Sequence, residues 1–357
     1  MSMYDREYLS KKIRGSLISA GVGDALGAPT ELYQIDEILN KYNGLLTSFV
    51  TPPNDTFAGD LNGVKGLITD DASQMYVLAE GLISAGYDQF TNQDWVECLL
   101  RWAQMQPYAN YQGPTTELIV KALKAGTPTN EIGRIGLSER QAPQVGVTNG
   151  AGMRVAPAGL VYPGDIDKSC ELALLTCLPS HDTNIAIASA CAIAAAVSQA
   201  MAHNATVDSV IEAALLGAAK GESLARQHAR VVAGPSIEMK IRLAVSIANE
   251  CDDLIEFLRK MEGHVGNSVL AHESIPCALG IIAFTQGDVF QGIVAATNIG
   301  NDTDSIATMV GSIAGALNGS DAIPQEMLDE WLAVNSRDFD VTAIADGLTE
   351  LAIKSLS

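Results

Sequence analysis

The chain has 357 residues, of which 22 are Lys or Arg and 42 are Asp or Glu, so its formal net charge at pH 7 is −20. This balance argues against nonspecific nucleic-acid binding and against an anionic membrane surface, because both require a basic face. Hydrophobic residues make up 47% of the chain, which is enough for a sizeable core and excludes a disordered protein.

Helical periodicity dominates the chain, with apolar residues at i, i+3 and i+4. The predicted helices are, in chain order, residues 72–86, 94–105, 169–177, 184–202, 207–228, 238–260, 275–285, 288–297, 305–318 and 325–333. Clear alternating strands are scarce, so we predict an all-α fold of many helices. Two loop-rich zones, 51–68 and 126–168, separate helices, and the second is long enough to be expected to carry function. Nothing in the composition marks a boundary, so we predict one domain over residues 1–357.

Several bulk features indicate a cytoplasmic protein. The first residues are polar and charged, without the apolar stretch of a signal peptide. The most apolar run, 185–202, is mostly alanine and lacks the Leu and Phe content of a membrane span, which predicts a buried helix. None of the six cysteines forms a Cys-x-x-Cys pair, so we expect all of them to be reduced and buried.

The segment from Gly21 to Glu31 crowds glycines against two carboxylates. It is not a dinucleotide-binding loop, because Leu26 stands where the third glycine is required, and it is not a P-loop. Two interpretations stay open. The segment is either a helix interrupted by glycines for close packing, or a tight turn that presents Asp24 and Glu31 to a shared site.

Two other segments each place a hydroxyl and two aspartates at a predicted helix start. The first is Thr-Asp-Asp at 69–71, and the second is Asn-Asp-Thr-Asp-Ser at 301–305. Capping needs only one such oxygen per helix, and clustered carboxylates raise one another's pKa unless cations neutralise them. If the two helix starts face each other, their hard oxygen donors suit Mg²⁺ or Mn²⁺. We therefore predict a two-metal site, with Glu31 as a fifth negative charge.

These segments, with two more, resemble the ADP-ribosylglycohydrolase family. The matching runs are GDALGAPTE (23–31), TDD (69–71), NGAGMRVAP (149–157), SHD (180–182) and NDTDSIATMVGSIAGALNG (301–319). The resemblance spans nearly the whole chain, and the runs stand in the family's order. It implies a compact, many-helix orthogonal bundle with a dinuclear Mg²⁺ or Mn²⁺ site.

Carried over by position, the resemblance assigns roles to residues of this chain. The metal ligands that it implies are Thr69, Asp70, Asp71, Asp302, Asp304 and Ser305. It makes Glu31 a mobile carboxylate beside the metals, either a ligand or the general base, and it counts Asp70 and Asp304 as catalytic.

The implied substrate-binding residues fall into two groups. Asn149, Gly150, Met153 and Arg154 resemble the loop along the ribose and phosphates, and His181 and Asp182 resemble the pocket border. An ordinary ion pair for Arg154 and a capping role for His181 stay open as alternatives. Segment 102–115 departs from the family pattern, and we add its Tyr108 as a substrate-binding candidate.

The resemblance predicts a hydrolase that cleaves the bond between the anomeric carbon of an ADP-ribosyl or ribosyl group and an N- or O-linked acceptor. Two Mg²⁺ ions, or Mn²⁺, are the expected cofactors. The expected partner is an ADP-ribosylated protein or a small ribosylated substrate, and neither nucleic acid nor a membrane. One alternative is a ribosylated metabolite or nucleoside, which the scarcity of basic residues favours. The other is a non-catalytic, crystallin-like structural protein, which the retained ligand positions oppose.

Overall fold

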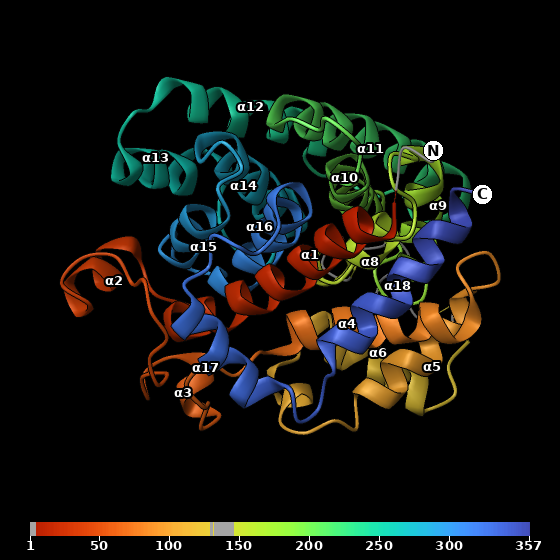
Figure 1. Ribbon diagram of the computed structural model, residues 1–357, viewed down its shortest axis with the longest axis horizontal. Helices are drawn as coiled ribbons and strands as arrows, with labels where there is room; N and C mark the ends of the chain where they lie inside the picture. The colour runs from red at the N-terminus through yellow and green to blue at the C-terminus, as the bar shows by residue number, and fades with distance from the viewer. Residues whose placement is uncertain (1–4, 129–130, 132–145) are drawn as a thin grey trace.

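A computed structural model describes residues 5–128, 131 and 146–357 (Figure 1). Within these residues the chain forms helices and turns, and its β-structure is limited to two isolated bridges, Thr148 with Leu270 and Thr183 with Arg230. The predicted all-α fold is therefore confirmed.

The helices run from α1 near the N-terminus to α18 near the C-terminus. The first group is α1 (Arg6–Gly27), η1 (Ala28–Thr30), α2 (Ile35–Lys41), α3 (Phe57–Asp60), α4 (Asp70–Ala85), α5 (Asn92–Trp102), η2 (Tyr108–Tyr111) and α6 (Pro114–Lys124). The second group is η3 (Asn149–Ala151), α8 (Ala156–Leu160), α9 (Ile166–Cys177), α10 (Asn184–Ala200), α11 (Val207–His228) and α12 (Ile237–Glu250). The last group is α13 (Leu254–Lys260), η4 (Met261–Val265), α14 (Ala271–Phe284), α15 (Val289–Thr297), α16 (Thr303–Asn318), α17 (Gln325–Asn335) and α18 (Val341–Ser355).

The predicted helices all overlap observed ones, with one division. The helix expected at 238–260 is split into α12 and α13, because Cys251 adopts an extended backbone and the side chain of Asp253 caps the new helix through the Glu256 amide. The predicted helices do not include α1, α2, α3, α6, α8 or α18, although a helix was one of the two interpretations for the segment that ends α1. The expected loop zone at 126–168 lies partly outside the described residues, and its later part contains η3, α8 and the start of α9.

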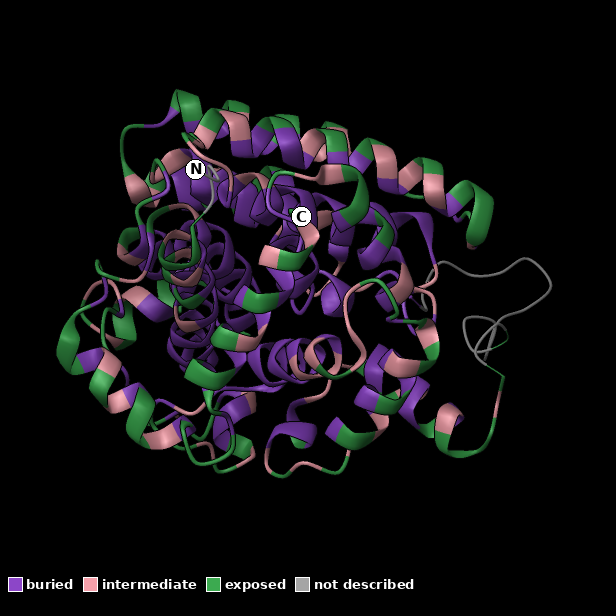
Figure 2. Cartoon of the chain, turned by 45° about the vertical axis from the view of Figure 1, so that its right-hand side comes forward, coloured by how far each residue is buried: buried purple, intermediate pink, exposed green. Residues whose placement is uncertain are grey.

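Helix α10 is the alanine-rich run that could be mistaken for a membrane span. All of its residues except Gln199 are buried, and it packs against α9, α11, α8 and α14. Figure 2 shows these buried helices inside, with outer helices that turn an exposed face to solvent. No helix of the described chain combines the length and the apolar content that crossing a membrane requires. All six cysteines are free and buried, as expected.

Helices α1 and α16 cross the centre of the molecule in backbone contact (Figure 1). Small residues recur at every fourth position on the facing sides, namely Gly15, Ser19, Gly23 and Gly27 on α1 and Ala307, Gly311, Gly315 and Gly319 along α16. A Cβ atom built at Gly311 would lie 2.2 Å from the carbonyl oxygen of Ser19, and one at Gly23 would lie 2.3 Å from that of Ala307. Residues 21–27 therefore form a helix whose glycines allow close packing, which is the first of the two interpretations. No side chain larger than hydrogen fits at Gly15, Gly23, Gly27, Gly311 or Gly315.

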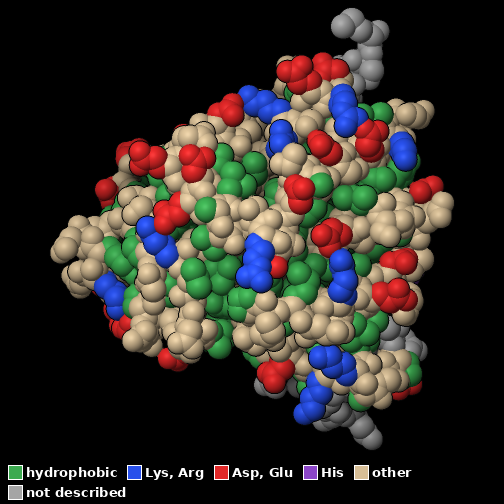
Figure 3. All heavy atoms as spheres, turned by 60° about the horizontal axis from the view of Figure 1, so that its bottom comes forward, with side chains coloured by type: hydrophobic (Ala, Val, Ile, Leu, Met, Phe, Trp, Pro, Cys, Tyr) green, Lys and Arg blue, Asp and Glu red, His purple; other side chains and the backbone are tan. Residues whose placement is uncertain are grey.

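The acidic charge is dispersed over the face drawn in Figure 3. On this face red carboxylates stand in small groups among blue Lys and Arg side chains, with hydrophobic side chains exposed between them. This face therefore offers no continuous basic path for a polyanion.

We predict that Gly311→Ala lowers the free energy of unfolding by about 1–3 kcal/mol, because the new methyl group forces α1 and α16 apart. The matched control is Gly263→Ala, where a Cβ meets no atom within 4 Å and should cost no stability. Urea unfolding with an unchanged m-value is the measurement. If both variants unfold at the same urea concentration as the wild type, α1 and α16 do not approach each other as closely as described.

Candidate active site and metal centre

A pocket of about 340 Å³ opens where η1, α4, η3 and α16 meet. Its acidic lining consists of Glu31, Asp70, Asp71, Asp302 and Asp304, together with Glu117 in the first turn of α6. Both α4 and α16 begin there, so the positive ends of two helix dipoles point at the same carboxylates. The condition on which the proposed metal site depends, that the two helix starts face each other, is thus met.

The start of α4 is held by Asp24, which one interpretation of the sequence placed in the shared site. The buried Asp24 carboxylate on α1 accepts hydrogen bonds from the Thr69 amide at 3.0 Å, the Thr69 hydroxyl at 2.8 Å and the Ala72 amide at 2.9 Å. Asp24 therefore does not line the pocket, which corrects the turn interpretation. It positions the Thr-Asp-Asp turn from behind, because three donors converge on one carboxylate.

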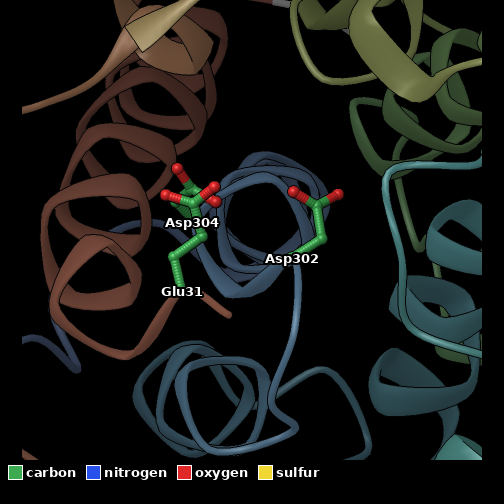
Figure 4. A group of neighbouring side chains, drawn as sticks. All are labelled: Glu31, Asp302 and Asp304. Atoms are coloured by element: carbon green, nitrogen blue, oxygen red, sulfur yellow. The ribbon is translucent and has the colours of Figure 1, made fainter. Parts of the chain in front are cut away.

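Three carboxylates of the pocket form a compact donor set (Figure 4). One oxygen from each of Glu31, Asp302 and Asp304 lies within 4.8 Å of the other two. Glu31 and Asp304 lie side by side near the start of α16, and Asp302 stands across the helix end from them. The Glu31 Oε2 and Asp71 Oδ1 atoms are buried and accept no hydrogen bond from the described residues. Buried oxygens of this kind, without a donor, are what a hard cation would coordinate, so this donor set fits divalent metal ions.

Gathering these groups away from water strongly disfavours their ionised forms. Burial, and then repulsion from Asp304, raises the pKa of Asp24 and of Asp302 to about 8. Burial raises the pKa of Asp304 itself to about 6. Burial and the neighbouring aspartates also hold the pKa of Asp70 and Asp71 well above the usual range. A cation bound at the cluster would reverse this effect.

The predicted substrate loop lies partly in the pocket. Asn149, Gly150 and Met153 line it, and the Asn149 amide group donates to Asp302 and, at 3.0 Å, to Ser274 Oγ. A Cβ at Gly150 would lie 2.9 Å from His181 Nε2, so glycine there lets the loop approach the histidine.

Four predicted substrate residues do not line the pocket. Arg154 and His181 are both fully buried behind it. Asp182 forms an ion pair with Arg230, with its shortest N–O distance at 2.6 Å. Tyr108 donates to Asp338 at 3.0 Å, and its ring packs on Phe339. Each of these four side chains has a partner elsewhere in the protein.

The sequence reasoning missed several pocket residues because they carry no motif. Thr116 and Thr148 supply hydroxyl groups, while Phe57, Tyr111 and the 62% exposed Leu32 supply apolar surface. Of these residues, Tyr111 could have been found from the sequence, because it lies in the same segment, 102–115, as the candidate Tyr108.

Comparison with known proteins agrees with this geometry. A family model described as ADP-ribosylglycohydrolase matches residues 5–355. YegU of Escherichia coli (strain K12) is 30% identical over 346 residues, which cover 94% of this chain and 96% of YegU. ADP-ribosylhydrolase ARH3 of Bos taurus is 24% identical over 337 residues, which cover 88% of this chain and 87% of ARH3.

A solved structure shows the same fold. It is that of an ADP-ribosylglycohydrolase-related protein complex, which matches 97% of this chain and 99% of its own with a TM-score of 0.64 at 21% identity. Since the family match runs over nearly the whole chain, this protein belongs to the ADP-ribosylglycohydrolase family and is a hydrolase.

Proposed function

We propose that the protein hydrolyses the bond between the anomeric carbon of an ADP-ribosyl group and an N- or O-linked acceptor, with two Mg²⁺ or Mn²⁺ ions in the pocket. The observation that supports this most is the meeting of two helix starts and Glu31, which gathers five carboxylates at one end of a pocket of ligand size. The residues that would hold the ions are Thr69, Asp70, Asp71, Asp302, Asp304 and Ser305.

The metals would supply fixed positive charge that binds ribose hydroxyls and lowers the pKa of a water molecule. Glu31 would accept the proton of that water, because one of its oxygens has no donor among the described residues. The water oxygen then bonds to the anomeric carbon and the bond to the acceptor breaks. The acceptor leaves with the proton that Glu31 took from the water. Asp70 and Asp304 orient the reacting groups from the two helix starts. Asn149, Gly150 and Met153 would contact the rest of the substrate.

We predict that Asp304→Asn abolishes most turnover and weakens Mg²⁺ binding, while the metal-free variant is at least as stable as the metal-free wild type. The stability follows from removing the charge that raises the pKa of Asp24, Asp70 and Asp302. The control is Asp252→Asn, an exposed position. Calorimetric Mg²⁺ titration, turnover and urea unfolding are the measurements. Full turnover in Asp304→Asn, or in excess chelator, would contradict the proposal. Elemental analysis that finds no bindable metal would support the structural alternative instead.

We also predict that the metal-free protein loses stability as the pH rises from about 4 to about 8. In the folded chain Asp24 and Asp302 have pKa values of about 8 and Asp304 of about 6. In the unfolded chain all three lie near 3.8, so the folded state binds more protons over this range and its stability falls with pH. Saturating Mg²⁺ should offset the loss, and its stabilising effect should grow with pH. Thermal unfolding in chelator and in Mg²⁺ tests this, and a metal-free stability that rises across the range would refute it.

A second candidate is a hydrolase of a phosphate-free riboside. Among the described residues, those that line the pocket include no Lys, Arg or His, which favours a substrate without phosphate. A mass-spectrometric panel of ADP-ribosyl-arginine, ADP-ribosyl-serine, O-acetyl-ADP-ribose and simple ribosides, each with Mg²⁺, Mn²⁺ or chelator, separates the two. Turnover of an ADP-ribosyl compound supports the first candidate, and turnover of ribosides alone supports the second.

A further inference from the structure

Arg154 is a fully buried guanidinium with no carboxylate at ion-pair distance among the described residues. Its hydrogen bonds go to Gln74 Oε1 at 3.0 Å, Ser180 Oγ at 2.9 Å and the Thr176 carbonyl at 3.4 Å. Its Cζ atom lies 4.6 Å from the centroid of the Trp95 ring. Burial lowers the pKa of Arg154 to about 10, so the group stays charged at neutral pH. A buried charge that makes only neutral contacts is costly, which calls for a reason beyond packing.

The first contact leads to the acidic cluster. A guanidinium can only donate, so the carbonyl oxygen of Gln74 must face Arg154. The Gln74 amide nitrogen must then face the other way, where it lies 3.3 Å from Asp70 Oδ2. Arg154 therefore fixes the orientation of Gln74, and Gln74 donates to the back of a carboxylate that lines the pocket.

The second contact leads to the opposite side of the pocket. Ser180 Oγ accepts from Arg154 and lies 2.9 Å from His181 Nδ1, and His181 Nε2 lies 3.1 Å from Thr148 Oγ1. Burial, and then the charge of Arg154, holds the pKa of His181 well below its ordinary value, so the ring is neutral and has one N–H.

The position of that proton follows from donor counting. If Nδ1 carried it, the buried Ser180 hydroxyl hydrogen would have no acceptor among its recorded contacts, and a second donor would point toward the guanidinium. If Nε2 carries it, Ser180 donates to Nδ1 and Nε2 donates to Thr148, so the Ser180 hydroxyl and both ring nitrogens have partners. The hydroxyl hydrogen of Thr148, which lines the pocket, then points to no acceptor among the described residues.

We infer that Arg154 is a positioning residue that sets the direction of two hydrogen-bond chains. One chain runs through Gln74 and holds Asp70. The other runs through Ser180 and His181, and makes the Thr148 hydroxyl a donor for a substrate oxygen that only accepts hydrogen bonds, of the phosphoryl class. The charge of Arg154 thereby acts on an anionic ligand that it does not touch. The identity of this ligand rests on the proposed function, whereas the direction of the chains does not.

The direction of the second chain is tested without any substrate. Nitrogen-15 NMR of the whole protein, with the His181 signals assigned from a His181→Gln variant, should show a neutral ring protonated at Nε2. Ser180→Ala should lose this fixed tautomer while the protein stays folded. Protonation of His181 at Nδ1 in the wild type would overturn the inference.

The ligand end of the chain is tested with ADP-ribose as the probe. Thr148→Val should weaken ADP-ribose binding by about 10-fold or more, Thr148→Ser should restore it, and neither should change Mg²⁺ affinity. A purely packing role for Thr148 would show the reverse order, because valine matches the size of threonine better than serine does. Wild-type affinity in Thr148→Val would overturn this part. If wild-type protein does not bind ADP-ribose at all, the proposed function fails, and the NMR result still decides the direction of the chain.

The metal end is tested by Mg²⁺ titration alone. Gln74→Met keeps the size of the side chain and removes the donor to Asp70, so Mg²⁺ affinity should fall by about 10-fold, in the range of outer-sphere substitutions at metal sites. The control is Gln104→Met at an exposed position. Unchanged Mg²⁺ affinity in folded Gln74→Met would overturn this part of the inference.

Discussion

The approach of α1 to α16 determines where every other part of the site can lie. The two helices touch at their backbones because small residues face each other along both, from Gly15 at one end to Gly27 at the other. A Cβ at Gly27 would lie 2.6 Å from the Asp304 Cα, so the end of α1 is pressed against the first turn of α16. The chain that leaves α1 therefore reaches the start of α16 within a few residues, and Glu31 arrives beside Asp304 (Figure 4).

Assembling carboxylates in this way opposes folding unless something neutralises them. Two helix dipoles and the hydrogen bonds that Asp24 accepts offset part of this cost. Burial still raises the pKa of Asp302 and of Asp304, and repulsion from Asp304 adds to the effect at Asp302. The binding energy of a metal ion would then be spent partly on ionising these groups, which links metal affinity, stability and pH. The overall charge of −20 says little about this site, because most acidic groups stand on the surface and the decisive ones are buried.

The sequence predicts the site residues that belong to local motifs. It does not predict the contacts of side chains whose partners depend on how the helices pack. Two predicted helices each begin with a hydroxyl and two aspartates, which is more than capping requires. This surplus indicated that the two helix starts could share one site. Asp24 could not be placed, because whether it faces the pocket or the Thr69 amide depends on the distance between α1 and α4. The contacts of Tyr108 and Asp182 could not be predicted for the same reason, since their partners Asp338 and Arg230 come from distant segments. Helix α1 was missed because its second half is buried on all sides and so lacks an amphipathic pattern.

An acidic protein that binds an anionic substrate must place positive charge near the ligand without neutralising its own metal ligands. A lysine or arginine in the pocket would compete with the metals for the carboxylates, because it could pair with Asp70 or Asp302 directly. The buried Arg154 avoids this competition, since Gln74 and the Ser180–His181 pair separate its charge from the pocket and pass on only an oriented donor. The guanidinium stays charged there without a carboxylate partner, because burial lowers its pKa only to about 10. Burying Arg154 in this position costs stability. The cost is explained if the protein needs both hydrogen-bond chains to point toward the pocket.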